Sequence, residues 1–306
     1  MTKTILDIYI KTLVDRVNDN HNVNIPPTLD VVFDGGAFNG GMGLGIAMYL
    51  KQLEKLNRIS IKRVSGCSIG SIIALYYLVN IKYDINNMFL EIRECFQNKF
   101  NLTRYKDCVR DFIFTNMTDD LSSINNVLHI TYYDLDSARQ IIQNQFKNRE
   151  DLLECIVKSS HLPFISNREF KYQGRYIDGI TPYVFRDNKR PVLFVMIITK
   201  FNYWRVFNTV NEDSVNERLL LGINDVDAFF NGNYSHMCSY YNNWSIFSTL
   251  SLRIREMIIL SIILLIEIYY SIYKYIPLSI KQTTFFSVIV NIFYSSGKDI
   301  LYHIVR

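Results

Sequence analysis

The sequence predicts an α/β fold with three layers, in which helices flank a mostly parallel central sheet, plus a helical C-terminal region. Strand-like apolar runs alternate with helical runs over residues 29–200, which is the pattern of a parallel sheet covered by helices. The β-branched run within residues 191–199 has the composition of a strand buried on both faces. A chain of 306 residues is long enough to bury one large core or two modest ones.

Residues 1–28 are predicted to form an N-terminal amphipathic helix and its connection to the sheet. Apolar side chains recur at helical spacing from Ile5 to Val17, and Pro26-Pro27 separates this stripe from the first core strand. Charged side chains interrupt any apolar core that a signal peptide would need: Lys3, Asp7, Lys11, Asp15 and Arg16. We therefore expect no signal peptide, and a helix that packs on the core.

A glycine-rich loop at residues 34–45 follows the first predicted strand and precedes a helix predicted over residues 46–56. Its successive N–H groups suit an oxyanion or a phosphate. A dinucleotide site is disfavoured because Ala37 stands at the third glycine and no acidic ribose partner follows the next strand. A P-loop is excluded because no Gly-Lys-Ser/Thr follows. Close helix packing through Gly41 and Gly45 is a structural alternative that is compatible with an oxyanion hole.

The second predicted strand ends in Gly66-Cys67-Ser68-Ile69-Gly70, which reads G-x-S-x-G and leads into a predicted helix. That context is a sharp strand-to-helix turn, which pushes the hydroxyl group of Ser68 out of the backbone. Glycine is expected on both sides because a Cβ there would clash with the neighbouring strand or helix. Ser68 is therefore a candidate nucleophile close to a helix N-terminus, where negative charge is favoured.

The remaining elements follow from hydrophobic periodicity. Strands are predicted over residues 29–33, 59–64, 127–133 and 191–199, and helices over residues 68–80, 84–126, 150–160 and 211–232. The tail contains an apolar run at residues 257–266 whose continuation is broken by Glu267 and Lys274. A membrane-spanning helix needs about 20 apolar residues, so we expect a buried or interfacial helix in preference to a span.

Composition narrows the class of protein. Five cysteines without a C-x-x-C pair indicate reduced thiols and a cytoplasmic location, and no metal-ligand cluster is visible. The net charge of +4 modestly favours anionic membrane surfaces, and it is too diffuse to indicate nucleic-acid binding. A second apolar run at residues 285–294 and a basic, aromatic end could lie on lipid. We expect a protein that is peripheral on membranes.

Four stretches in order resemble the patatin-like phospholipase family. They are the loop Asp34–Gly40, the elbow Gly66–Gly70, the helix at 150–160 with His161-Leu162-Pro163-Phe164, and Asp178-Gly179-Ile180. They are similar to the family's D-G-G-G-x-R/K-G loop, G-x-S-x-G elbow, A-S-x-A-x-P segment and D-G-G/A loop. The resemblance implies a catalytic core at residues 29–200, between the N-terminal helix and a C-terminal strand and helical region at residues 201–306.

This resemblance implies a lipid acyl hydrolase that cleaves carboxylic esters of phospholipids or lysophospholipids without a cofactor. Ser68 would be the nucleophile and Asp178 the base, and Gly35, Gly36 and Ala37 would supply N–H groups to the oxyanion. A carboxylate can take the serine proton directly if it lies within hydrogen-bond reach. Family members are sometimes silent until a partner binds, so the resemblance also implies that a host activator could be needed.

Three residues depart from the family pattern. Ala37 replaces the third loop glycine, which is a mild change provided that the backbone keeps a negative φ. Asn39 stands where plant and bacterial members usually have Arg or Lys, so a basic contact to substrate or structure is expected to be absent. Ile180 replaces Gly or Ala, which predicts a narrower pocket beside the aspartate.

Three alternatives remain open at this stage. Asp178 could be only a turn residue, because Asp-Gly is a common turn pair. A Ser-His-Asp esterase would need one of the histidines after Ser68, which are His129, His161, His236 and His303. The third alternative is a membrane-associated protein that keeps the fold and has lost turnover.

Overall fold

The structure is a computed structural model that describes residues 5–17, 26–79, 84–209 and 212–288, with residues 291, 292, 295, 296 and 299. The chain divides into two compact units, Met1–Asn243 and Trp244–Arg306. The first unit therefore extends past residue 200, where the predicted core ends. Each unit is described by itself below.

A seven-stranded sheet forms the centre of the first unit, with the order β4-β3-β2-β1-β6-β7 and β5 paired with β3. The four central strands β3, β2, β1 and β6 are parallel, and β4, β5 and β7 run antiparallel to their neighbours. The prediction of a mostly parallel sheet is confirmed. The strands are β1 (Thr28–Phe33), β2 (Ser60–Cys67), β3 (Leu128–Asp134), β4 (Arg139–Gln143), β5 (Tyr176–Ile177), β6 (Val192–Val195) and β7 (Cys238–Tyr240).

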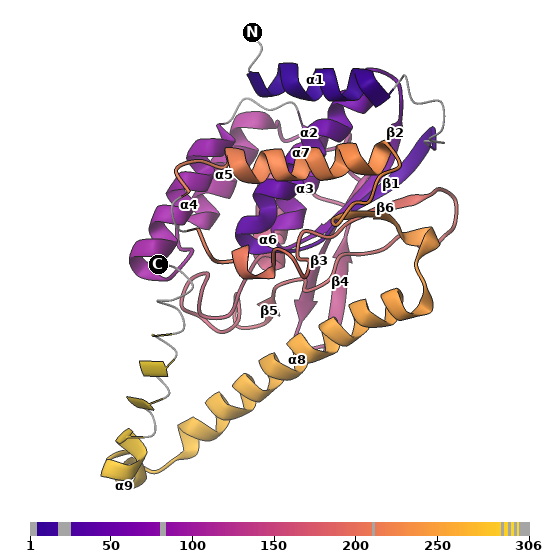
Figure 1. The fold of residues 1–306 in the computed structure, drawn as a ribbon. Helices are drawn as coiled ribbons and strands as arrows, with labels where there is room; N and C mark the ends of the chain where they lie inside the picture. The colour runs from indigo at the N-terminus through magenta and orange to yellow at the C-terminus, as the bar shows by residue number, and fades with distance from the viewer. Residues whose placement is uncertain are drawn as a thin grey trace. The chain divides into compact units, whose positions relative to one another are not determined.

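Helices flank this sheet, so the predicted α/β class is confirmed (Figure 1). Helix α3 contacts β1, β2 and β3, and α2 contacts α1, α3 and α7. The polar-faced stretch predicted as helical over residues 84–126 forms two helices and an irregular segment. The helices are α1 (Ile5–Val17), α2 (Gly40–Lys55), α3 (Ile69–Leu78), α4 (Ile85–Lys99), α5 (Tyr105–Asn116), α6 (Arg149–Ser159) and α7 (Asn216–Phe230).

Helix α2 begins at Gly40, and the prediction that the loop continues to Gly45 is wrong. The glycines lie inside the helix because α7 packs directly on its backbone. A Cβ on Gly45 would lie 2.1 Å from the carbonyl oxygen of Leu219, and a Cβ on Gly222 of α7 would lie 1.9 Å from that of Met42. The two helices approach each other through reciprocal glycines, which offsets the low helix propensity of glycine.

The carboxyl ends of β1, β2 and β6 meet at one edge of the sheet, and the loops that follow them are joined by hydrogen bonds. The N–H group of Asp34, directly after β1, donates to the carbonyl oxygen of Val195 at the end of β6 (2.9 Å). In open α/β sheets, ligands bind outside the carboxyl ends of the parallel strands. This edge is where the candidate site lies.

The second unit contains the long helix α8 (Ile246–Tyr275) and the short helix α9 (Leu278–Lys281). The Ser245 hydroxyl caps α8 by accepting a hydrogen bond from the N–H group of Ser248 (3.2 Å). Of the helices in the described residues, none combines the length and the apolar character that crossing a bilayer requires. Part of the second apolar run, residues 289–290 and 293–294, lies outside the described residues.

Candidate active site

Ser68 lies at the sharp turn between β2 and α3, where the G-x-S-x-G pattern predicts it. Its backbone adopts φ 54° and ψ −133°, a conformation that is costly for a residue with a side chain. A Cβ on Gly66 would lie 2.2 Å from the Gly70 carbonyl oxygen, and one on Gly70 would lie 2.4 Å from that of Phe33. The predicted need for glycine on both sides is confirmed. The Ser71 hydroxyl donates to the Ser68 carbonyl oxygen (2.6 Å), which fixes the first turn of α3.

Ser68 lines an apolar cavity of about 690 Å³, counting its open mouth. Three hydroxyl groups interrupt the apolar wall, those of Ser68, Tyr105 and Ser160, and the Tyr105 hydroxyl donates to the Ser160 oxygen (2.7 Å). Burial raises the pKa of Tyr105, and the charge of Asp178 adds to the rise, so the phenol stays protonated at neutral pH. The apolar lining includes Phe38, Leu44, Ile69, Met88, Phe89 and Ile92.

The glycine-rich turn after β1 lies directly against the serine. A Cβ on Gly35 would lie 3.1 Å from the Cβ of Ser68, and a Cβ on Gly36 would lie 2.9 Å from Cγ1 of Ile197. The turn therefore fills the space between the elbow and the loop after β6, and larger residues would force them apart. The N–H group of Gly35 donates to Oδ1 of Asp34 (2.9 Å).

Ala37 adopts a left-handed backbone with φ 45°, so the condition for a mild replacement of glycine is not met. This conformation costs a residue with a Cβ roughly 1–2 kcal/mol. Ala37 begins a short 3₁₀ turn, η1 (Ala37–Asn39), in which the Asn39 N–H group donates to the Gly36 carbonyl oxygen (2.9 Å). Within the described residues, the N–H groups of Gly36 and Ala37 donate to no acceptor.

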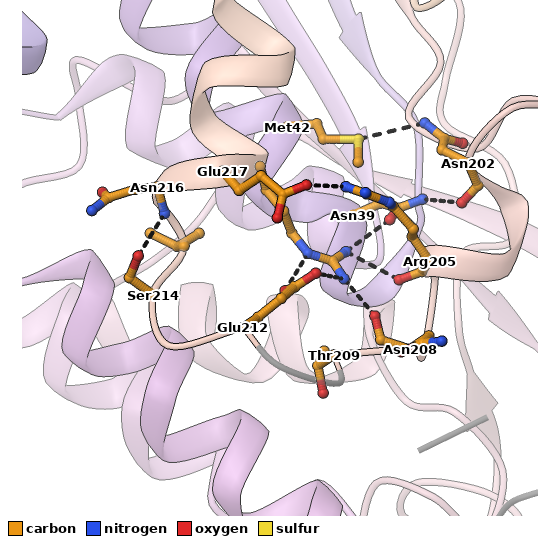
Figure 2. A network of polar contacts seen from close by, with 12 residues as sticks. Asn39, Met42, Asn202, Arg205, Asn208, Thr209, Glu212, Ser214, Asn216 and Glu217 are labelled. Carbon is orange, nitrogen blue, oxygen red and sulfur yellow. Dashed lines mark hydrogen bonds and ion pairs between the residues drawn. The ribbon is translucent and has the colours of Figure 1, made fainter. Parts of the chain in front are cut away.

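Asn39 stands at the position where the family has Arg or Lys, and its side chain accepts a hydrogen bond from a guanidinium on α7. Arg218 is wholly buried, and its Nη1 donates to Oδ1 of Asn39 (2.8 Å). Its Nε and Nη2 donate to the Glu212 carboxylate at 2.8 and 2.9 Å, and Figure 2 shows Asn39, Arg205, Asn208 and Glu212 gathered in this network. The expectation that a basic contact is absent here is therefore wrong, because α7 supplies one.

One carbonyl oxygen connects the serine elbow to the aspartate loop. The N–H groups of Ser68 and Gly179 both donate to the Ser159 carbonyl oxygen, each at 3.0 Å. The N–H group of Asp178 donates to the carbonyl oxygen of His161, also at 3.0 Å. The end of α6 therefore holds the backbones of residues 68 and 178–179 beside each other, and both Ser68 and Asp178 are buried.

Asp178 also forms the turn that its Asp-Gly pair predicts, because its Oδ1 accepts a hydrogen bond from the N–H group of Ile180 (2.8 Å). Ile180 is buried with φ 58° and is not among the residues that line the cavity of Ser68. Asp178 does not line this cavity either, so the narrowing predicted beside the aspartate stays a prediction. A Cβ on Gly179 would lie 2.3 Å from the Thr131 carbonyl oxygen, so this glycine allows the loop to lie against β3.

An ion pair fixes the short strand that precedes Asp178. Nε of Arg175 donates to Oδ1 of Asp134 at the end of β3 (2.7 Å), which supplements the pairing of β5 with β3. The hydrogen bonds from Arg175 hold the pKa of the Asp134 carboxyl group well below its usual value, so this carboxylate is charged over the physiological pH range. The aspartate loop is thus held by the hydrogen bonds to Ser159 and His161 and, through β5, by the ion pair between Arg175 and Asp134.

A histidine-dependent mechanism would need one of the histidines that follow Ser68. His129 is buried in β3, and His161 is buried after α6, where burial lowers the pKa of its imidazole. His236 is exposed, and His303 lies outside the described residues. None of the described histidines lines the cavity of Ser68, and the described part of the chain contains no group of three metal-ligating side chains.

Three side chains near the site were missed by sequence reasoning: Tyr105, Ser160 and Arg218. Only Arg218 could have been identified from a pattern in the sequence. Arg218 shares a helix face with Gly222 and Val226, at a spacing of four residues, so the periodicity of the helix places a lone cation on its buried side. Tyr105 and Ser160 had no such signal, because their contact depends on how α5 packs on α6.

Comparison with known protein families agrees with this arrangement. The family model described as patatin-like phospholipase matches residues 31–188, which is more than half of the chain and includes the glycine-rich turn, Ser68 and Asp178. No curated protein sequence matches the chain. The matched region spans β1 to β5, the part of the sheet whose loops build the site. The chain therefore belongs to the patatin-like phospholipase family, a family of lipid acyl hydrolases.

Proposed function

We propose that this protein hydrolyses carboxylic ester bonds of phospholipids or lysophospholipids through an acyl-enzyme on Ser68. The observation that carries the proposal is a serine in a costly conformation in the wall of an apolar cavity. Backbone strain of this kind persists only where the surroundings hold it in place, and it clusters at active sites.

Asp178 acts as the base in the proposed mechanism. It takes the proton of the Ser68 hydroxyl as Oγ attacks the ester carbonyl carbon, and it returns that proton to the leaving alkoxide. A water molecule, deprotonated by Asp178, then attacks the acyl carbon of the acyl-enzyme. The bond to Ser68 Oγ breaks, Oγ takes back the proton from Asp178, and the fatty acid is released. The shared hydrogen bonds to the Ser159 carbonyl oxygen support this pairing, because they hold the two backbones side by side.

The proposed oxyanion donors are the N–H groups of Gly36 and Ala37, with that of Gly35. The first two donate to no acceptor in the described residues, whereas the Gly35 N–H group donates to Asp34 and would have to be shared with the substrate. Losing one such donor typically reduces the rate by about 10²- to 10³-fold. The electrostatic stabilisation in this proposal therefore rests mainly on residues 36 and 37.

The proposed substrate places the protein at a membrane surface. The apolar cavity would hold the acyl chain, and the head group would remain outside. We extend the proposal to a cytoplasmic protein that is peripheral on membranes and to the requirement for a host activator that the family resemblance implies. The addition of a cell lysate to an otherwise silent enzyme would reveal such an activator.

The test is release of fatty acid from mixed phospholipid vesicles by the wild type, Ser68→Ala and Asp178→Asn, with and without host-cell lysate. We expect release by the wild type and a loss of at least 10³-fold in both variants. Ser65→Ala is the matched control, because this buried hydroxyl has no hydrogen-bond partner among the described residues. Circular dichroism confirms that each variant is folded.

Replacement of His129, His161, His236 and His303 one at a time tests the histidine-dependent alternative. Retained release in all four variants supports the Ser-Asp mechanism, and loss of release at one of them with the fold intact contradicts it. If no condition gives release while the protein still binds vesicles, the chain is a membrane-associated protein without turnover.

A further inference from the structure

A tight turn after β6 exposes three large aromatic side chains in succession. Phe201, Tyr203 and Trp204 are 55%, 64% and 52% exposed, and we call the segment Thr199–Val206 the aromatic turn. Exposed apolar side chains that occur singly need no explanation, but a cluster marks an interaction surface. Three aromatic residues within four positions form such a cluster.

The exposure results from a well-anchored backbone. Asn202 at the centre of the aromatic turn is buried, and its Oδ1 accepts a hydrogen bond from the Thr199 N–H group (2.7 Å). Its carbonyl oxygen accepts from the N–H group of Arg205 (3.0 Å) and from Nδ2 of Asn39 (3.2 Å). With Asn202 held inside, the aromatic rings on either side of it are held outward.

A second segment continues the same patch. The ring of His236 lies 4.4 Å from that of Phe201 and 4.8 Å from that of Tyr234, centroid to centroid. Tyr234 is 76% exposed. The patch therefore combines residues from the loop after β6 with residues from the segment before β7.

Two cations lie among these rings. Nζ of Lys200 is 5.0 Å from the ring centroid of Phe201. The guanidinium of Arg205 is 5.2 Å from the ring centroid of Trp204 and also donates to the carboxylate of Glu217 (2.8 Å), so Lys200 is the cation better placed to meet a phosphate. Tryptophan and tyrosine beside lysine or arginine are typical of surfaces that lie at the level of lipid head groups, where rings meet the acyl boundary and cations meet phosphates. Lysine is depleted at the centre of protein interfaces, so Lys200 among the rings favours a lipid surface over a protein partner.

We propose that the aromatic turn docks on the surface of a phospholipid bilayer and presents the active site to it. This inference rests on the proposed function, because a lipid substrate must reach Ser68 from a bilayer. The turn contacts the glycine-rich loop directly, since the Phe38 N–H group donates to the Val206 carbonyl oxygen (3.1 Å) and Asn39 donates to Asn202. Two hydrogen bonds therefore link the aromatic turn to the loop that supplies the proposed oxyanion donors.

Fluorescence of Trp204 tests docking without any turnover. The chain has two tryptophans, so Trp244→Phe leaves Trp204 as the single reporter, and Ser68→Ala removes hydrolysis. We expect a blue shift, and quenching by lipids brominated in the upper acyl chain, when this full-length protein meets phosphatidylcholine vesicles that contain an anionic lipid. An unchanged spectrum with both anionic and neutral vesicles overturns the proposal, whatever other part of the chain binds.

A second measurement compares two substrates. Replacement of Phe201, Tyr203 and Trp204 by serine is expected to reduce hydrolysis of vesicle lipid about tenfold relative to hydrolysis of a soluble short-chain ester by the same variant. Ile142→Ser, which removes a 43% exposed side chain from β4, is the control and should leave this ratio unchanged. An equal loss of activity on both substrates overturns the docking proposal. Absence of hydrolysis by the wild type contradicts the proposed function instead, and the Trp204 spectrum then still tests docking.

Discussion

At the scale of single residues, the glycine-rich turn contains a strained position that can be relieved. Ala37 holds φ 45°, which glycine adopts without the steric penalty of a Cβ. We expect Ala37→Gly to raise the free energy of unfolding by about 0.5–1 kcal/mol, after allowance for the greater entropy of glycine in the unfolded chain. Urea denaturation monitored by circular dichroism measures the change.

The control is Ala47→Gly in the interior of α2, where the backbone is helical and the side chain is buried. This substitution should lower the free energy of unfolding by about 1 kcal/mol or more. Equal destabilisation by both substitutions would show that the left-handed backbone of Ala37 stores no strain.

At the scale of elements, the buried guanidinium of Arg218 joins α7 to Asn39 in the glycine-rich turn. Removing one partner of a buried ion pair leaves the other charge uncompensated, which costs about 3–5 kcal/mol. We expect Arg218→Met to lower the free energy of unfolding by that amount. The double variant Arg218→Met/Glu212→Gln should recover part of the loss, because no buried carboxylate then remains unpaired.

Urea denaturation of both single variants and of the double variant gives the coupling energy. The exposed pair Arg110–Glu150 is the comparison, since its side chains are 43% and 51% exposed and surface pairs contribute little. A coupling energy for Arg218–Glu212 no larger than that of the surface pair would contradict a structural role for the buried network.

The elements that could be predicted are those with long apolar patterns. Strands β1, β2, β3 and β6 and helices α1 and α6 lie close to their predicted positions. The strands contain runs of consecutive buried residues, and the helices bury one face at helical spacing. Strand β5 has only two residues and is fixed by contacts with β3, so no local pattern could reveal it. The early start of α2 depends on reciprocal glycines of α7 that lie far along the chain.

The candidate site likewise contains residues that could be predicted from local motifs and residues that could not. Ser68, Asp178 and the glycine-rich turn could be located because each is a short motif with local chemistry. The contact between Asn39 and Arg218 joins residues 179 positions apart and depends on the packing of α7 on α2, which no single-sequence pattern encodes. The left-handed backbone of Ala37 was missed because alanine ordinarily avoids that conformation.

At the scale of the whole molecule, the free energy of unfolding should depend on pH through a half-buried lysine. Nζ of Lys51 in α2 donates to the carbonyl oxygens of Tyr76 (2.9 Å) and Val79 (2.6 Å) at the end of α3. Burial lowers the pKa of Lys51 to about 8, although the charge of Glu54 opposes the shift. Between that value and the ordinary lysine pKa of about 10.4, the folded protein has lost a proton that the unfolded chain retains.

The folded state is therefore favoured as pH rises through this window, and the free energy of unfolding should increase from pH 8 toward pH 9.5. Lys51→Met has no such group, so its stability should lack this increase. Urea denaturation of both proteins at half-unit intervals from pH 7.5 to 9.5 measures the difference, and parallel pH profiles would contradict the assignment to Lys51.

The carbonyl oxygen of Ser159 has a consequence for how the site can diverge. Because one acceptor anchors both the serine elbow and the aspartate loop, a displacement of the last turn of α6 carries both residues in the same direction. The position of Ser68 relative to Asp178 is then preserved, while the position of both residues relative to the cavity changes. Under the proposed function, variation in α6 could thus change the acyl chain length that the site accepts without separating Ser68 from Asp178, so alignment and selectivity would be separable traits in this fold.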